Sequence, residues 1–258
     1  MGDDPSSIEG SVPLPRLTLR TRDGSFALPL SACEPLPPST QDVVSEAIRD
    51  ANMPDEVPRG LPYPPEQSPP RFVKFWGTVH EFARRFPQGA QYAPKNGGFL
   101  SNLHINYLYS LFSRKDGDMF VIRAKAPTAP DTRSGQEVTG GFEMRYFSIC
   151  QNELATQRFV GCLYDAEVAL DEDGYLTIVV SDPADRPDNA ANWLPWGGAY
   201  YDGNIIYRHM LPAADFDHSI QRVPYGVDEA AVMGEYFPRI KACSRQLFEA
   251  GGYSACGL

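Results

Sequence analysis

The chain has 258 residues, of which 42% are hydrophobic and 12% aromatic, and its 23 basic and 33 acidic residues give a formal net charge of −10. This composition supports a sizeable packed core and excludes wholesale disorder. The acidic balance argues against nucleic acid or an anionic membrane as the main partner, because both require basic patches. No apolar run approaches the roughly eighteen residues that cross a bilayer, so we expect no membrane span.

The N-terminal third predicts a tail, a hairpin and a helix. Residues 1–15 are polar and contain proline, which is typical of a loose tail. Leu17–Arg20 and Phe26–Leu30 flank an Asp-Gly turn and predict a β-hairpin. Residues 39–51 predict a capped helix, and the proline-rich residues 54–71 predict an extended surface crossing.

Aromatic residues at helical spacing predict a second helix between Pro70 and Pro87. His80 lies off the aromatic stripe, which predicts that it is exposed to solvent. The stripe recurs every three or four residues and favours packing on a sheet; its members are Phe72, Phe75, Trp76, Val79, Phe82 and Phe86.

The middle of the chain predicts consecutive strands. Leu103–Phe112 and Met119–Arg123 flank a Lys-Asp-Gly turn and predict a second hairpin. Residues 171–174 predict a tight turn, and residues 192–198 an aromatic, proline-bearing loop. Four strands organise this region: Phe142–Gln151, Phe159–Leu170, Tyr175–Ser181 and Asn204–Leu211.

After these strands, Glu229–Glu235 and Arg239–Ala250 predict two helices broken by Pro238. Short strands in series with helices at the ends predict a mainly β fold, an antiparallel β-sandwich or jelly roll with N-terminal and C-terminal helices. We expect a single domain over residues 1–258. Its parts are the tail, the hairpin and helices of residues 16–99, the sandwich core of residues 100–212 and the helices of residues 213–258.

The cysteines bear on whether the protein resides in an oxidising or a reducing compartment. No Cys-x-x-Cys pair suggests a zinc ribbon or a thioredoxin-like site. Cys150 and Cys162 flank a predicted hairpin turn at equal distances, so they can face each other, and a disulfide there would fit an oxidising compartment. Buried free thiols in a cytosolic protein are the alternative. The number is odd and the full pairing stays open among Cys33, Cys150, Cys162, Cys243 and Cys256.

Several segments resemble a bacterial family of domains of unknown function, the "twelve-fourteen" family, over about residues 100–245. The matching segments are Glu143–Ser148, Asp173–Ser181, Asn192–Pro195, Tyr207–Pro212 and Met233–Arg239. The resemblance implies a jelly-roll-like envelope or secreted protein of bacteria. It does not imply an activity, and the N-terminal third does not take part in it. Residues 1–7 do not predict a signal peptide, so a secreted or periplasmic location requires a signal that has been removed.

The sequence contains no standard catalytic motif. His104, His209 and His218 match no metal template in their spacing, so we expect no metal and no cofactor. Charged residues on the predicted strands are the remaining candidates for a functional site. Arg145 and Arg208 lie between apolar neighbours, either as solvent-facing or ion-paired residues or as part of a ligand pocket.

The first functional hypothesis is an extracytoplasmic β-sandwich that binds a small, partly apolar molecule with a polar or acidic group. Its ligand-binding residues would be Arg145, Arg208, Trp193, Trp196 and Tyr146. The second is a cofactor-independent hydrolase, lyase or cyclase in the same pocket, with His104, Glu143 or Tyr207 as acid or base. The third is a carbohydrate-binding module. The sequence does not indicate the oligomeric state.

Overall fold

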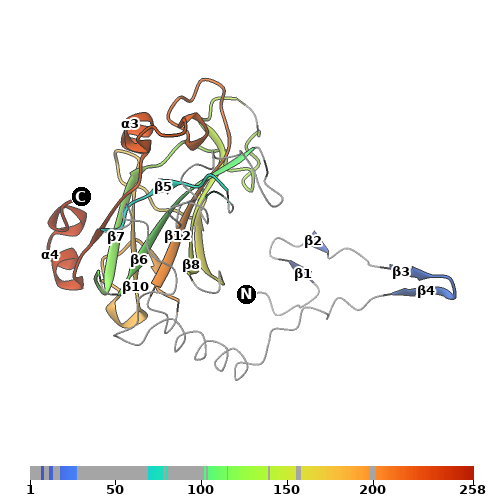
Figure 1. The fold of residues 1–258 in the computed structure, drawn as a ribbon, viewed down its shortest axis with the longest axis horizontal. Helices are drawn as coiled ribbons and strands as arrows, with labels where there is room; N and C mark the ends of the chain where they lie inside the picture. Colours follow the sequence, from blue (N-terminus) through green and yellow to red (C-terminus); the bar gives the residue numbers. More distant parts are fainter. Residues whose placement is uncertain are drawn as a thin grey trace. The chain divides into compact units, whose positions relative to one another are not determined.

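Alternating apolar side chains build two sheets that pack face to face in the computed structural model (Figure 1). The structure describes residues 7–8, 12–13, 18–27, 69–77, 80, 102, 104–114, 116–138, 140–154, 158–197 and 202–258. The chain divides into two units, Met1–Val44 and Ser45–Leu258. The sandwich belongs to the second unit.

The first sheet has the strand order β5-β6-β12-β8-β9, and every pair in it is antiparallel. The central strand β12 pairs with β6 on one side and with β8 on the other. The strands are β5 (Val73–Lys74), β6 (Ile105–Ser113), β8 (Met144–Glu153), β9 (Phe159–Tyr164) and β12 (Asp202–Pro212).

The second sheet has the order β11-β10-β7-β13, in which β11 runs parallel to β10 and the other pairs are antiparallel. Its strands are β7 (Met119–Lys125), β10 (Tyr175–Ser181), β11 (Asn192–Pro195) and β13 (Arg239–Ala242). Between residues 181 and 238, 3-10 turns connect elements: η4 (Pro183–Asp185), η5 (Ile220–Arg222) and η6 (Gly234–Tyr236).

The main core lies between the sheets. Alternate residues of each strand face inward, as the two-residue period of a strand requires. The five-stranded sheet contributes Leu108, Phe112, Phe147, Ile149, Ile205 and Tyr207, and the four-stranded sheet contributes Phe120, Ile122, Leu176, Ile178, Val180 and Leu194. Burial of each large apolar side chain contributes about 1.5–3 kcal/mol to folding.

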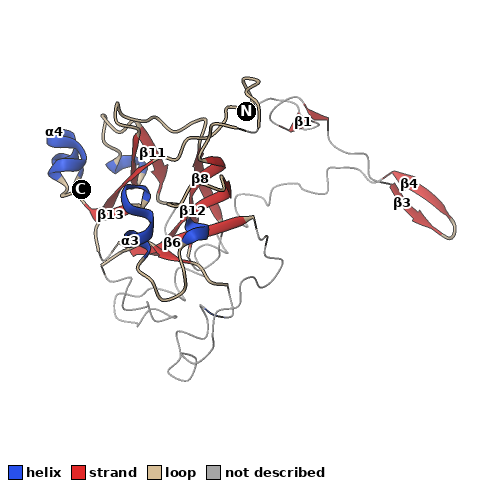
Figure 2. Cartoon of the chain, turned by 90° about the horizontal axis from the view of Figure 1, so that it is seen from above, coloured by secondary structure: helices blue, strands red, loops and turns tan. Residues whose placement is uncertain are grey.

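Two short helices follow the strands, α3 (Glu229–Met233) and α4 (Arg245–Ala255). The two views show α4 beside β13 (Figures 1 and 2). Phe248 of α4 packs with Val121 and Val179 on the outer side of the four-stranded sheet. Ser244 caps α4 by accepting a hydrogen bond from the Leu247 amide.

Two disulfides stabilise the second unit. Cys150–Cys162 joins β8 to β9, and Cys243–Cys256 joins the end of β13 to the end of α4. The first pair confirms the cross-strand arrangement that the hairpin pattern predicts. Among the described residues, no helix is long and apolar enough to span a membrane.

The described residues of the first unit form two short antiparallel pairs. β1 (Ser7–Ile8) pairs with β2 (Val12–Pro13), and β3 (Thr18–Thr21) pairs with β4 (Gly24–Ala27). The second pair confirms the Asp-Gly hairpin. The predicted helix of residues 39–51 lies outside the described residues.

The structure confirms the mainly β class, the antiparallel sandwich and the turn at residues 171–174, where Gly174 donates to the Asp171 carbonyl. Within the described residues, helical decoration comprises α3, α4 and the helical residue His80, which falls in the helix predicted between Pro70 and Pro87. The helix predicted from residue 72 is wrong at its start, because Val73 and Lys74 pair with β6. His80 is 5% exposed rather than solvated.

Four further predictions are corrected. The strands β6 and β7 belong to different sheets, because the chain crosses the sandwich between them instead of forming a hairpin. Arg239–Ala242 is a strand, since β7 offers a free edge for its backbone. Asn192–Pro195 is also a strand rather than a loop, and β9 ends at Tyr164 instead of continuing to Leu170.

Candidate functional site

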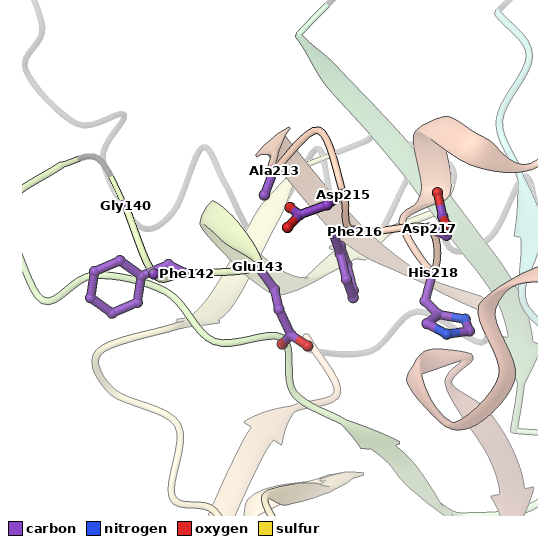
Figure 3. Close-up of a pocket in the computed structure, with 9 residues that line it drawn as sticks. Gly140, Phe142, Glu143, Ala213, Asp215, Phe216, Asp217 and His218 are labelled. Carbon is purple, nitrogen blue, oxygen red and sulfur yellow. The ribbon is translucent and has the colours of Figure 1, made fainter.

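An open pocket of about 670 Å³ lies where the loop before β8 meets the loop after β12 (Figure 3). The two loops are neighbours because the β8–β12 ladder places Met144 opposite Pro212. The Phe216 ring lies between the Glu143 carboxylate and the His218 imidazole. The lining residues are Gly140, Gly141, Phe142, Glu143, Ala213, Asp215, Phe216, Asp217 and His218.

Unusual backbone conformations shape both loops. Gly140 and Gly141 have φ values of 91° and 80°, which side-chain-bearing residues rarely adopt. Leu211 has a φ of 51° at the end of β12, and it is the non-glycine residue with positive φ in the described chain. Such strain concentrates at functional sites, and here it turns the chain into the pocket wall.

Glu143 is held firmly at the pocket. Its Oε2 accepts a hydrogen bond of 2.8 Å from the Thr128 amide, and its Oε1 accepts one of 2.6 Å from the Tyr236 hydroxyl. Burial, and then the hydrogen bond with Glu143, raise the pKa of Tyr236 above its ordinary range. Tyr236 is therefore a donor, and the carboxylate keeps further lone pairs for a ligand.

His218 presents an acceptor to the pocket. Its Nδ1 lies 2.9 Å from the Val232 carbonyl oxygen, which only accepts, so Nδ1 carries the proton. In the neutral ring Nε2 is then a free lone pair. The ring stacks on Tyr236 with centroids 5.6 Å apart, and Tyr236 in turn contacts Phe216 at 5.0 Å.

The pocket thus combines hydrogen-bond acceptors with an apolar floor. Its side-chain polar groups are the carboxylates of Glu143, Asp215 and Asp217 and the imidazole of His218. Phe216 is buried and supplies apolar surface. In the described part of the chain, no group of His, Cys, Asp or Glu side chains is placed to hold a metal ion. The arrangement suits an organic group that donates hydrogen bonds.

Of the residues predicted for the site, Glu143 lines the pocket. His104 is exposed at the adjoining edge of the sheet, where its carbonyl accepts from the Leu211 amide at 3.0 Å. Tyr207 lies in the main core and is fully buried. These three candidate acids or bases therefore do not line one cavity.

The two predicted arginines are not brought together. Arg145 is half-buried and donates a long hydrogen bond of 3.5 Å to Thr132. Arg208 lies on the outer face of the five-stranded sheet, with its guanidinium carbon 5.4 Å from the Tyr107 ring centroid. Tyr146, half-buried, pairs with Met210 on the same sheet.

The two predicted tryptophans lie elsewhere. Trp196 is 1% exposed, and its ring contacts Phe112 at 4.8 Å within the core. Trp193 belongs to the outer side of the four-stranded sheet, where its Nε1 donates to the Ser181 hydroxyl at 3.0 Å. Both are framework residues in this structure.

Sequence reasoning missed His218, Phe216 and Tyr236. The Gly-Gly pair at residues 140–141 was an available signal, because consecutive glycines before a strand favour a turn that exposes backbone. No local pattern places residues 213–218 beside that turn. Their proximity follows from strand register.

No protein-family model matches the chain, and no curated protein matches it. Among solved structures, an uncharacterized protein from Burkholderia cenocepacia is 15% identical, with a TM-score of 0.35 over 80% of this chain and 50% of that one. The VPA0106 protein from Vibrio parahaemolyticus is 20% identical, with a TM-score of 0.33 over 55% of this chain and 31% of that one. This chain therefore spans half or less of the length of these two proteins, and the TM-scores are too low to inform function.

Proposed function

We propose that this protein binds a small, partly apolar molecule in the pocket formed by Glu143, Phe216 and His218. The observation that carries the proposal is the pairing of an apolar floor with acceptor groups at one open pocket. A ligand with a hydrogen-bond-donating head, best an ammonium group, fits these carboxylates. The acidic head group expected from Arg145 and Arg208 fits less well, because neither arginine lines the pocket.

The proposal places the protein outside the cytoplasm. Two disulfides support this, since such bonds persist in oxidising compartments. Membership of the "twelve-fourteen" family is part of the same proposal, and it rests on the sequence segments from Glu143 to Arg239.

The test uses three probes of defined chemistry. Phenethylamine carries an aromatic ring and a cation, phenylacetate carries the same ring and an anion, and cellobiose represents a carbohydrate. Titration calorimetry should show binding of phenethylamine and none of phenylacetate. Glu143→Gln should weaken phenethylamine binding by about tenfold, because the amide keeps the shape and removes the charge.

The matched control is Glu249→Gln, since Glu249 pairs with Arg245 on α4 and does not line the pocket. This variant should bind phenethylamine like the wild type. Binding of phenylacetate in preference to the amine would contradict the acceptor pocket. Binding of cellobiose alone would favour a carbohydrate-binding module.

A second candidate function is a cofactor-independent hydrolase, lyase or cyclase. The fixed tautomer of His218 favours it, because a free Nε2 lone pair is the form in which histidine acts as a general base. A simple ester such as p-nitrophenyl acetate tests this candidate. Turnover that His218→Gln abolishes and Glu249→Gln retains would support an enzyme, and equal background rates in all three proteins would remove it.

A further inference from the structure

The two fixed acceptors of the pocket lie on either side of an apolar ring. Glu143 directly precedes β8, His218 lies in the loop after β12, and the Phe216 ring lies between them (Figure 3). All three line one open pocket of about 670 Å³, which is large enough for a small ligand to reach both acceptors. A ligand that contacts Glu143 alone would leave the second acceptor unused.

Tyr236 holds the two acceptors apart. Its hydroxyl donates to Glu143 Oε1 at 2.6 Å, while its ring stacks on the His218 ring with centroids 5.6 Å and planes 18° apart. The hydroxyl and the ring face are separate parts of one rigid side chain, so the two contacts fix Glu143 and His218 at different places. A ligand that serves both acceptors therefore needs two hydrogen-bond donors with an apolar spacer between them.

Each acceptor favours a different kind of donor. Thr128 donates to Glu143 Oε2 from its amide at 2.8 Å and from its hydroxyl at 3.3 Å, so Oε1 is the oxygen with more room for a ligand. This carboxylate suits a cation. His218 instead offers Nε2 as a neutral lone pair, because its Nδ1 donates to the Val232 carbonyl oxygen at 2.9 Å. A hydroxyl suits that lone pair, since a second cation would lose hydration for an uncharged partner.

We propose that the pocket selects amines that carry a hydroxyl group on the far side of an aromatic ring, as phenolic amines do. The ammonium group pairs with Glu143, the ring lies against Phe216, and the hydroxyl donates to His218 Nε2. This selectivity rests on the proposed function, because the hydroxyl adds a second anchoring group to the same cationic ligand. The ligand class narrows from aromatic amines in general to aromatic amines with a donor at both ends.

Three probes that differ only at the para position test this selectivity. Phenethylamine has no para substituent, tyramine has a hydroxyl, and para-methoxyphenethylamine has the same oxygen without its hydrogen. Titration calorimetry should show that tyramine binds about fivefold tighter than phenethylamine, because it gains one hydrogen bond. The methoxy compound should bind no tighter than phenethylamine.

The outcomes separate the selectivity from the pocket itself. Equal affinities of tyramine and phenethylamine would overturn the selectivity and leave the proposed pocket intact, and so would a methoxy compound that binds as tightly as tyramine. Failure of all three probes to bind would overturn the proposed function, and the selectivity with it.

His218→Phe tests which residue accepts the hydrogen bond from the hydroxyl. Phenylalanine keeps a ring against Tyr236 and removes the acceptor, so tyramine should lose its advantage over phenethylamine in this variant. Glu249→Gln, which does not alter the pocket lining, should keep the advantage. An advantage that persists in folded His218→Phe would overturn the assignment to His218.

If His218→Phe does not fold, the nitrogen chemical shift of His218 Nε2 in the wild type replaces the variant. This shift should change more with tyramine than with para-methoxyphenethylamine, because only tyramine donates a hydrogen bond to the lone pair. Equal changes with the two probes would overturn the assignment.

Discussion

The guanidinium carbon of Arg123 lies 3.5 Å from the centroid of the Tyr253 ring, so the strand β7 holds the C-terminal helix through a buried cation. Arg123 is 7% exposed and also donates to Asp171 at 2.7 Å and to Thr177 at 2.8 Å. Although burial opposes it, the hydrogen bond from Arg123 leaves the pKa of Asp171 below its ordinary value. One arginine thus joins the turn before β10 to α4.

Arg123→Met should lower the free energy of unfolding by about 2 kcal/mol, because it removes the cation from both the Tyr253 ring and Asp171. Urea unfolding measures this change. Arg239→Met is the control, since Arg239 stands opposite Arg123 in the β7–β13 ladder but is exposed. Equal effects of the two substitutions would show that the contact with Tyr253 does not stabilise the fold.

His209 should make stability depend on pH. Burial lowers its folded-state pKa to about 3, below the unfolded value of about 6.5, so the unfolded chain binds more protons between these values. Stability is then complete above about pH 6.5 and falls as the pH decreases, by about 2 kcal/mol at pH 5. Urea unfolding at several pH values measures the slope.

His209→Gln should flatten this pH dependence, because glutamine does not titrate and its oxygen can still accept from the Ile220 amide, which donates to His209 Nδ1. His104→Gln provides the comparison, since His104 is exposed. A slope that persists in His209→Gln and disappears in His104→Gln would refute the assignment.

Leu211 should tolerate residues that favour the left-handed conformation. Its φ is 51°, and the residue is 46% exposed, so backbone strain affects the stability more than burial of the side chain does. Leu211→Asn should be at least as stable as the wild type, whereas Leu211→Val should lose about 1 kcal/mol because β-branched residues resist this conformation. A more stable valine variant, measured by thermal unfolding, would contradict the strain.

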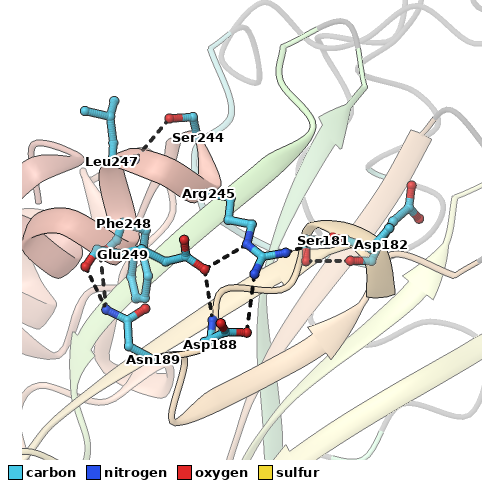
Figure 4. A network of polar contacts seen from close by, with 10 residues as sticks. Ser181, Asp182, Asp188, Asn189, Ser244, Arg245, Leu247, Phe248 and Glu249 are labelled. Carbon is cyan, nitrogen blue, oxygen red and sulfur yellow. Dashed lines mark hydrogen bonds and ion pairs between the residues drawn. The ribbon is translucent and has the colours of Figure 1, made fainter.

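The Cys243–Cys256 disulfide should protect α4. Replacing both residues by alanine should cost about 3 kcal/mol and expose α4 to limited proteolysis before the sandwich unfolds. Arg245 still ties the helix to Asp188, and Asn189 donates to the Phe248 carbonyl, which slows complete detachment (Figure 4). The variant with alanine at both Cys150 and Cys162 should leave α4 protected. If α4 is cleaved in this variant too, the Cys243–Cys256 disulfide is not what protects the helix.

Local patterns predicted much of the sandwich. Alternating residues around Val179 and around Ile205 identified strands that the structure confirms, and equal spacing from a turn identified the Cys150–Cys162 pair. Long-range pairing was not predictable in this way. Arg239–Ala242 has a pattern that also suits a helix, and the free edge of β7 decides its conformation.

The candidate site, like the fold, could be predicted from local patterns only in part. Glu143 was recognisable as a charged residue at the start of a strand. Its neighbours His218 and Phe216 are 75 and 73 positions further along by their sequence numbers, and the β8–β12 register brings them close. Arg208 and Trp196 suited a ligand site by residue type, but strand alternation places Arg208 on the outer face of its sheet and packing places Trp196 in the core.

The position of β12 has a consequence for how the chain acquires its structure. The strands β6 and β8 do not pair with each other, and β12, which follows both in the sequence, joins them. Until residue 212 has been synthesised, both strands keep an open edge that invites pairing with other chains. Folding of the sheet must therefore wait for late, non-local contacts, which are slow to form. A chain truncated before β12 should aggregate rather than fold in part.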